Sequence, residues 1–175
     1  LVCSGSSGTS SQAYGRSHDL SNLDTGGNDI SLQCVTWGMK QAVEDLTATV
    51  NVYSDDDGNP ASGLAFIGSI DGTISANDQP FYQTFEFDGL VVPAGILFIE
   101  LIVDESTSQN SHSIAANDAG QSSPSWIRTL DGSCSVGNWT DLANIGYPDV
   151  HWVEQIEVAI AVPADPCNDP LPECA

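Results

Sequence analysis

The sequence predicts an all-β protein, a jelly-roll-like antiparallel β-sandwich of about nine strands. Three observations favour this fold class. Short segments rich in β-branched and aromatic residues recur along the chain, several with alternating apolar and polar residues. Clusters of Gly, Asp, Asn, Ser and Pro separate these segments, and no segment shows a helical period. The 175 residues are 41% hydrophobic, which suits one domain with a substantial core.

The first part of the chain predicts three strands, at 13–20, 30–42 and 46–53. Turn-forming residues at 24–29 separate the first two strands. The segment 30–42 is rich in β-formers, and 46–53 alternates as Leu-Thr-Ala-Thr-Val-Asn-Val-Tyr. The most turn-rich stretch of the chain, 54–63, follows.

The middle of the chain predicts three more strands, at 64–70, 81–87 and 96–103. Asp71-Gly72 has the composition of a hairpin turn that ends the first of them. Val92-Pro-Ala-Gly95 is expected to form the turn before 96–103. That last segment is apolar on both parities, which is typical of a central strand.

The last part of the chain predicts strands at 112–116, 125–130 and 150–162, the last of them long and alternating. An ordered loop is expected at 132–148. We therefore assign 1–162 to the β-sandwich domain and the Pro-rich segment 163–175 to a tail or linker.

The charge of the chain limits its partners. Twenty-four acidic residues and three basic ones give a formal net charge of −21. Such a polyanion repels nucleic acid phosphates and anionic lipid headgroups. No apolar stretch is long enough to span a membrane, so membrane insertion is not expected. A charged fraction of only 15% is more typical of extracellular β-proteins than of cytosolic enzymes, and indicates a secreted or cell-surface protein.

The five cysteines point to an oxidising compartment, because none forms a C-x-x-C pair typical of structural zinc sites. Cys167 and Cys174 flank a short Pro-rich segment and are expected to close a local loop. Cys3 and Cys134 lie in Ser/Gly-rich segments and are expected to pair with each other. Cys34 then remains, either as a buried free thiol or as half of an intermolecular bridge.

The acidic turn after the third strand is a candidate calcium site. Asp55, Asp57 and Asn59 occupy alternate positions, so three side-chain oxygens could converge on one hard cation. The spacing is not that of an EF-hand loop. The alternative is an ordinary solvated turn, and the acidic pair at 104–105 would add ligands only if the fold brought it near.

The late aromatic residues are candidates for binding a polysaccharide. Trp139 and Tyr147 fall in the expected loop, and sugar rings stack on exposed aromatic faces. Asp149 and His151 share one face of a strand, and the pair is a candidate for the same ligand or for a metal or acid–base element. The alternatives are core packing for the tryptophan and a structural hydrogen bond for the histidine. No nucleophile motif is present, so we expect no catalytic residues.

Several short motifs follow one another along the chain in an order that indicates a family resemblance. They are Cys3-Ser-Gly-Ser-Ser-Gly8, Tyr14-Gly-Arg16, Val35-Thr-Trp-Gly38, Val50-Asn-Val-Tyr53, Val92-Pro-Ala-Gly95, Asn117-Asp-Ala-Gly-Gln-Ser-Ser-Pro-Ser125 and the closing segment from Thr140 to His151. In these motifs the chain resembles a non-catalytic β-sandwich module that recurs in secreted and surface multidomain proteins of bacteria. The resemblance covers about residues 3–162. It implies a sandwich fold, an extracellular location and attachment to larger enzymes or adhesins.

The sequence therefore predicts a secreted, non-catalytic module that acts by binding or self-assembly. One hypothesis is recognition of extracellular polysaccharide, with calcium as a candidate ligand. Another is a structural subunit of a surface layer, fibre or matrix that binds copies of itself. A related alternative is an accessory carbohydrate-binding domain of a larger secreted hydrolase.

Overall fold

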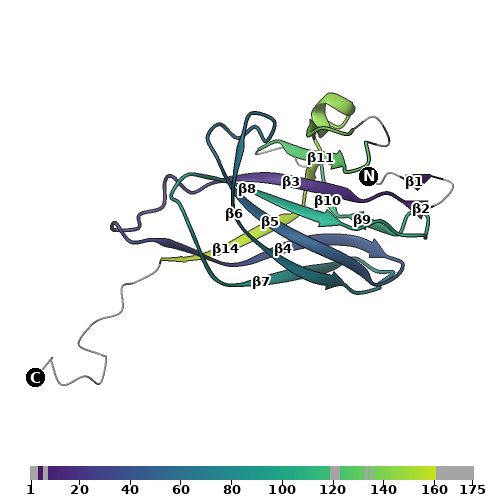
Figure 1. Ribbon diagram of the computed structural model, residues 1–175, viewed down its shortest axis with the longest axis horizontal. Helices are drawn as coiled ribbons and strands as arrows, with labels where there is room; N and C mark the ends of the chain where they lie inside the picture. The colour runs from purple at the N-terminus through teal and green to yellow at the C-terminus, as the bar shows by residue number, and fades with distance from the viewer. Residues whose placement is uncertain (1–3, 6–7, 119–122, 133, 135, 161–175) are drawn as a thin grey trace, which may run out of the picture.

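The protein folds into two antiparallel β-sheets that pack face to face (Figure 1). The computed structural model describes residues 4–5, 8–118, 123–132, 134 and 136–160. All strand pairs in this part of the chain are antiparallel, and its helical structure is limited to 3-10 geometry, at Cys134 and in a short turn at Leu142–Ile145. The predicted all-β class is confirmed, and the predicted tail at 163–175 lies outside the described residues.

The larger sheet has six strands in the order β12-β11-β3-β8-β5-β6. Their bounds are Thr140–Asp141 for β12, Ser125–Thr129 for β11, Gln12–Asp19 for β3, Ile96–Val103 for β8, Leu46–Asp55 for β5 and Leu64–Ile74 for β6. β8 lies between β3 and β5, so the strand with apolar residues of both parities is central, as predicted.

The smaller sheet has four strands, with β4 paired to β14, β7 and β9. Their bounds are Ile30–Ala42 for β4, Glu154–Ile160 for β14, Phe81–Val92 for β7 and His112–Ile114 for β9. Two further pairs of two-residue strands complete the set: β1 (Ser4–Gly5) with β2 (Gly8–Thr9), and β10 (Ala116–Asn117) with β13 (His151–Trp152).

The core lies between the inner faces of the two sheets. Alternation along each strand sends every second side chain inward, for example Val50 and Val52 from β5 and Val35 and Trp37 from β4. Trp152 is 1% exposed and its ring packs edge-on against another aromatic ring of the core. Burying side chains of this size contributes about 1.5–3 kcal/mol each, which is why this seam holds the sheets together.

A buried polar chain also crosses this core. Tyr14 of β3 donates to Gln12, and its hydroxyl lies 2.9 Å from His112 Nε2 of β9. Ser111 Oγ lies 3.1 Å from the other ring nitrogen. Burial lowers the pKa of His112 to about 4, so the imidazole is neutral at physiological pH. This series of hydrogen-bonded side chains links the six-stranded sheet to the four-stranded one without placing a charge in the core.

Several expectations need correction. The jelly roll of about nine strands is not confirmed, because the two main sheets hold six and four strands and β5 pairs with its sequence neighbour β6. Asp71-Gly72 is not a turn but lies inside β6, opposite Thr49 and Ala48. The Phe85 ring explains why a glycine stands at position 72, because a Cβ there would lie 2.9 Å from that ring.

The expected loop at 132–148 contains regular structure in its described part. β12 is followed by a 3-10 turn at Leu142–Ile145. Asp141 caps this turn by accepting from the amide of Ala143, and Gly146 ends it with a positive φ of 97°. The segment thereby adds an edge strand to the six-stranded sheet beside β11.

Candidate binding surface

The outer face of the six-stranded sheet carries a row of aromatic rings. Strand pairing places Phe66 of β6, Tyr53 of β5 and Phe98 of β8 side by side. Their rings meet at centroid distances of 5.7 and 6.4 Å. Trp139 extends the row, 5.0 Å from Phe98 in a T-shaped contact. We call these four residues, with Asn51, Glu100 and Arg128, the aromatic face.

A carboxylate lies at the centre of the aromatic face although it belongs to the solvent side of the sheet. Glu100 is only 1% exposed. Its Oε2 accepts from Asn51 Nδ2 at 2.9 Å and from the Tyr53 hydroxyl at 2.8 Å. Its Oε1 accepts from Arg128 Nη2 at 2.5 Å. These donors offset the large cost of removing a carboxylate from water.

Aromatic rings pack beside this carboxylate and its cationic partner. The guanidinium of Arg128 lies 4.7 Å from the centroid of the Trp139 ring, a cation–π contact that covers one face of the indole. The tip of the Phe98 ring reaches over the neighbouring strand, where a Cβ at Gly15 would fall 2.2 Å from the ring. The glycine at position 15 is therefore required for this arrangement of the ring.

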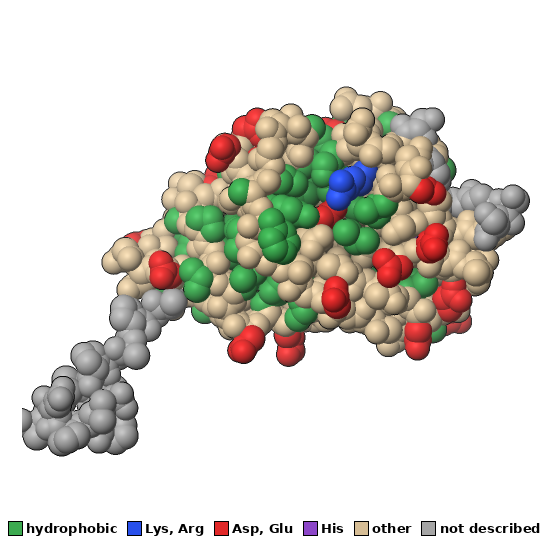
Figure 2. All heavy atoms as spheres, viewed as in Figure 1, with side chains coloured by type: hydrophobic (Ala, Val, Ile, Leu, Met, Phe, Trp, Pro, Cys, Tyr) green, Lys and Arg blue, Asp and Glu red, His purple; other side chains and the backbone are tan. Residues whose placement is uncertain are grey.

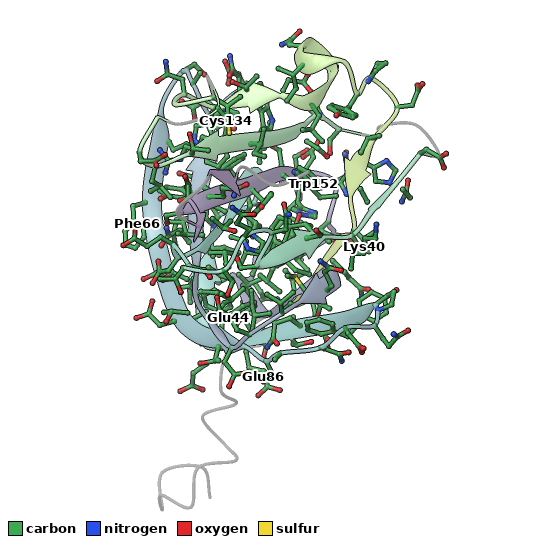
Figure 3. The ribbon with its side chains drawn as sticks, turned by 90° about the vertical axis from the view of Figure 1, so that its right-hand side faces the viewer. Lys40, Glu44, Phe66, Glu86, Cys134 and Trp152 are labelled. Atoms are coloured by element: carbon green, nitrogen blue, oxygen red, sulfur yellow. The ribbon has the colours of Figure 1, made fainter. Side chains whose placement is uncertain are left out.

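Exposure differs along the row and is greatest at Phe66. Phe98 is fully buried, Trp139 and Tyr53 are half-buried, and Phe66 is 61% exposed. Figure 2 shows hydrophobic side chains gathered on the face turned to the viewer, around a basic side chain, with most acidic groups toward the rim. In Figure 3 the side chain of Phe66 projects away from the body of the protein. The ring of Phe66 is thus available for stacking.

Desolvation changes the proton affinity of the tyrosine in this face. Burial raises the pKa of Tyr53 to about 12, and the neighbouring Glu100 carboxylate adds to the effect. The phenol therefore stays protonated and keeps donating its hydrogen bond at any physiological pH. The aromatic face presents fixed donors, a neutralised ion pair and an exposed ring, which is the chemistry that recognises sugar hydroxyls and ring faces.

The structure separates the four predicted ligand-binding residues. Trp139 belongs to the aromatic face, whereas Tyr147 is 42% exposed just after the 3-10 turn. Asp149 is exposed, and His151 pairs with Asn117 between β13 and β10. Within the described part of the chain, no hydrogen bond or ring contact joins any two of the four. The roles of Tyr147, Asp149 and His151 in binding stay predictions.

The predicted calcium turn is held together by its own side chains. Asp55 Oδ1, Asp57 Oδ1 and Asn59 Oδ1 each accept from a backbone amide two residues further on. These hydrogen bonds lower the pKa of Asp57 and are typical of Asx turns. Asp55 is 5% exposed. Among the described residues no group of three His, Cys, Asp or Glu side chains is arranged to hold a metal, so calcium binding stays a prediction.

The second acidic pair does not reach this turn. Asp55 lies opposite Ile96 at the start of β8, whereas Asp104 follows the end of that strand. The eight residues of β8 separate them by roughly 25 Å. Asp104 and Glu105 instead line a cleft of about 580 Å³ at the other end of the sheet, together with residues 44–47.

Two of the five cysteines, Cys34 and Cys134, lie among the described residues. Cys134 is disulfide-bonded. Cys3, Cys167 and Cys174 lie outside the described residues, so both predicted pairings stay predictions. Cys34 is a free thiol, but it is half-exposed on the outer face of the four-stranded sheet rather than buried in the core. Its parity in β4 explains this placement, because Val35 takes the inward position.

Comparison with known proteins identifies a similar fold. No protein-family model matches the chain, and no curated protein matches it in sequence. The fold resembles the crystal structure of the cysteine protease and lectin-like domains of Cwp84, a surface layer associated protein of Clostridium difficile, with a TM-score of 0.59 and 12% identity. That match covers 88% of this chain and 33% of the other.

A second structure of the clostridial cysteine protease Cwp84, after propeptide cleavage, matches with a TM-score of 0.61 and 12% identity. It covers 88% of this chain and 37% of that one, so the chain spans about a third of each matched protein. At 12% identity, these TM-scores show a shared fold and nothing more. In addition, no helix among the described residues has the length and hydropathy needed to cross a membrane.

Of the seven residues of the aromatic face, sequence reasoning singled out only Trp139 as a candidate, and it missed Asn51, Tyr53, Phe66, Phe98, Glu100 and Arg128. Glu100 interrupts an apolar run in a central strand, and that interruption was the available signal. A charge inside such a strand requires partners, and Arg128 is one of only three basic residues in the chain. Pairing the two would have placed β11 and β8 near each other on one face.

Proposed function

We propose that this chain is an extracellular, non-catalytic module that binds polysaccharide through the aromatic face. One observation carries the proposal: Phe66, 61% exposed, ends a row of aromatic rings beside a buried carboxylate that is fully hydrogen-bonded on the solvent side of a sheet. Exposed rings next to fixed polar groups suit a ligand with apolar ring faces and many hydroxyls.

The fold comparison supports the same proposal. The matched crystal structure contains a lectin-like domain, and its protein is associated with a surface layer. A chain that spans about a third of such a protein suits a module attached to a larger surface protein or secreted hydrolase. The strongly acidic surface, the disulfide-bonded Cys134 and the low content of charged residues agree with an extracellular location.

The proposal assigns no catalytic role. Ser111 lies within hydrogen-bond distance of His112, but both residues are fully buried, so no substrate reaches them. The proposed module contributes by holding a larger protein at a glycan surface. Polysaccharide recognition is therefore the first of the two modes that the sequence suggests, and self-assembly is the second.

The test is retention on polysaccharides with a matched pair of variants. Phe66→Ala removes the exposed ring of the aromatic face, and Tyr82→Ala removes a ring that is 73% exposed on the opposite sheet. We expect Phe66→Ala to weaken binding about tenfold or more, because exposed aromatic anchors dominate such interfaces. Tyr82→Ala should bind like the wild type.

Thermal unfolding of both variants controls for stability, since Phe66→Ala also loses its ring contact with Tyr53, worth about 0.5–1.5 kcal/mol. Equal losses in the two variants would contradict the assignment of the surface. Light scattering on the same samples would detect self-assembly, and oligomers unaffected by Phe66→Ala in a protein that retains no glycan would favour the second mode.

A further inference from the structure

We infer that the aromatic face selects uncharged oligosaccharides and discriminates against glycans that carry carboxylate, sulfate or phosphate groups. The inference rests on the proposed function and adds the class of ligand. It follows from the local charge of the face, from where the few cations of the chain lie, and from the field of the whole protein.

The aromatic face is electrically neutral. Arg128 is its cation, and the 2.5 Å contact between Arg128 Nη2 and Glu100 Oε1 neutralises it. The guanidinium is also covered by the Trp139 ring, so it cannot turn away from the carboxylate without losing two contacts. An acidic sugar would therefore have to compete with a buried carboxylate that is already hydrogen-bonded by three donors.

No other cation of the chain is placed to bind an acidic sugar there. The chain has only two further basic residues, Arg16 and Lys40. Arg16 is 8% exposed and donates to the carbonyl of Trp152 and to Ser123 Oγ. Lys40 is exposed but belongs to β4 of the other sheet. Figure 3 places Lys40 on the opposite side of the molecule from Phe66.

The rim of the aromatic face carries negative charge. On β6, Asp71 accepts a hydrogen bond from Thr49 Oγ1 at 2.7 Å, one position along the strand face from Asn51. On β12, Asp141 lies opposite Trp126, which shares a face with Arg128. An anionic glycan laid across the rings would share this face of the sheet with both carboxylates. The net charge of −21 adds a general repulsion that salt screens.

The remaining polar groups of the face suit hydroxyls. Asn51, Thr49 and Ser69 lie in adjacent positions on the outer side of β5 and β6, and each can both donate and accept a hydrogen bond. The row from Phe66 to Trp139 runs across β6, β5 and β8, perpendicular to the strands, and spans roughly 15 Å. This length fits an oligosaccharide rather than a single sugar ring.

The experiment uses an array of oligosaccharides that spans α- and β-linkages, with each uncharged member accompanied by its uronate, its sulfate ester and its amino-sugar counterpart. Wild type, Phe66→Ala and the control Tyr82→Ala are compared at about 20 mM and about 0.5 M NaCl. Interactions between surface charges are weakly screened at the lower concentration and strongly screened at the higher one. Binding is counted as specific only where Phe66→Ala weakens it and Tyr82→Ala does not.

We expect the specific signals to come from uncharged members, with less than about a twofold change between the two salt concentrations. The uronate and sulfate counterparts should bind about tenfold more weakly at low salt and recover part of that loss at high salt. Amino sugars attracted by the general negative field should bind Phe66→Ala as well as wild type, and lose that binding at high salt.

Specific binding that prefers an anionic or an amino-sugar member at low salt would overturn the inference and leave the proposed function standing. The absence of any specific signal across the array would contradict the proposed function itself. Specific binding to an uncharged member that is unaffected by salt would support both.

Discussion

The outer faces of the two sheets differ in how they treat their acidic residues. On the six-stranded sheet Glu100 is buried and accepts three hydrogen bonds, one of them from the Tyr53 hydroxyl. On the four-stranded sheet Glu86 and Glu157 are exposed and flank Cys34, with Glu157 within 3.7 Å of its thiol. The first face is a built polar cluster, and the second is a solvated sheet surface.

The contrast agrees with the proposed location of the binding site. Solvating a carboxylate on a sheet surface needs no special arrangement, whereas burying one requires donors from separate strands. The donors to Glu100 come from β5 and β11, which flank the central strands on either side. Replacing such an arrangement by an apolar one of the same shape is often neutral or stabilising, so stability alone does not account for it, and it agrees with the proposed role in binding.

The largest expected effect is on stability when the buried carboxylate is removed. Glu100→Ala leaves the guanidinium of Arg128 without its carboxylate and two donors without an acceptor. We expect a loss of about 3–5 kcal/mol in the free energy of unfolding, measured by urea denaturation. The matched control, Glu86→Ala on the other face, should change it by less than about 0.5 kcal/mol.

Comparable losses in the two variants would remove the contrast between the faces. Glu100→Gln sharpens the test, because the amide keeps an acceptor oxygen but carries no charge. Its expected effect lies between those of the wild type and Glu100→Ala. If Glu100→Gln were as stable as the wild type, the hydrogen bonds rather than the charge would account for the cluster.

A smaller loss of stability is expected on acidification. It should originate at His112 in the core between the two sheets, and not on either outer face. The pKa of His112 is lowered by burial to about 4 in the folded protein, against an ordinary value of about 6.5. Between these values the unfolded chain binds a proton that the folded chain does not. Stability contributed by the neutral imidazole is therefore complete above pH 6.5 and declines as the pH falls toward 4, by about 3 kcal/mol in total.

The measurement is the free energy of unfolding by urea at several pH values between 4 and 7. His112→Gln is expected to be less stable at neutral pH and to show a shallower pH dependence by about one proton. Comparing slopes rather than absolute stabilities separates titration from packing. An unchanged slope in His112→Gln would assign the acid sensitivity to the surface carboxylates.

Much of the fold was predictable because burial imposes a period on the sequence. The predicted strands at 30–42 and 96–103 coincide with β4 and β8, since both are long and apolar enough to dominate their neighbourhood. The expected turn at Asp71-Gly72 was wrong because local turn chemistry yielded to a tertiary contact, the Phe85 ring against Gly72. Turn composition alone carries no information about such a contact.

The aromatic face was harder to predict because it depends on register. Simple alternation puts Phe66 and Gly68 on the same side of β6. A bulge between them changes this, so that Gly68 lies opposite the inward-facing Val52 and Phe66 opposite the outward-facing Tyr53. The bulge is a property of the pairing of two strands, and neither strand reveals it by itself. Trp139 was predictable as a ligand candidate only because it falls outside the strongest strand patterns.

The smallest expected effect concerns the thiol of the other face. The pKa of Cys34 is raised, first by desolvation and then by the neighbouring Glu157 and Glu86, so little thiolate forms near neutral pH. An intermolecular bridge at this position would also bring two acidic sheet faces together. We therefore expect Cys34 to react slowly with iodoacetamide at about pH 8, and Glu157→Gln to speed the reaction a few-fold by removing the closer carboxylate.

Asp71→Asn, on the aromatic face, is the control for net charge and should leave the rate unchanged, because its effect on a thiol on the other sheet is screened. Equal acceleration by both substitutions would mean that the overall charge of −21, rather than the two flanking glutamates, holds the thiol protonated. Fast alkylation of the wild type, or a disulfide-linked dimer in the absence of oxidant, would favour an intermolecular disulfide through Cys34. A slow reaction that Glu157→Gln accelerates would instead leave the four-stranded face as a solvated surface, and the aromatic face as the one built for a ligand.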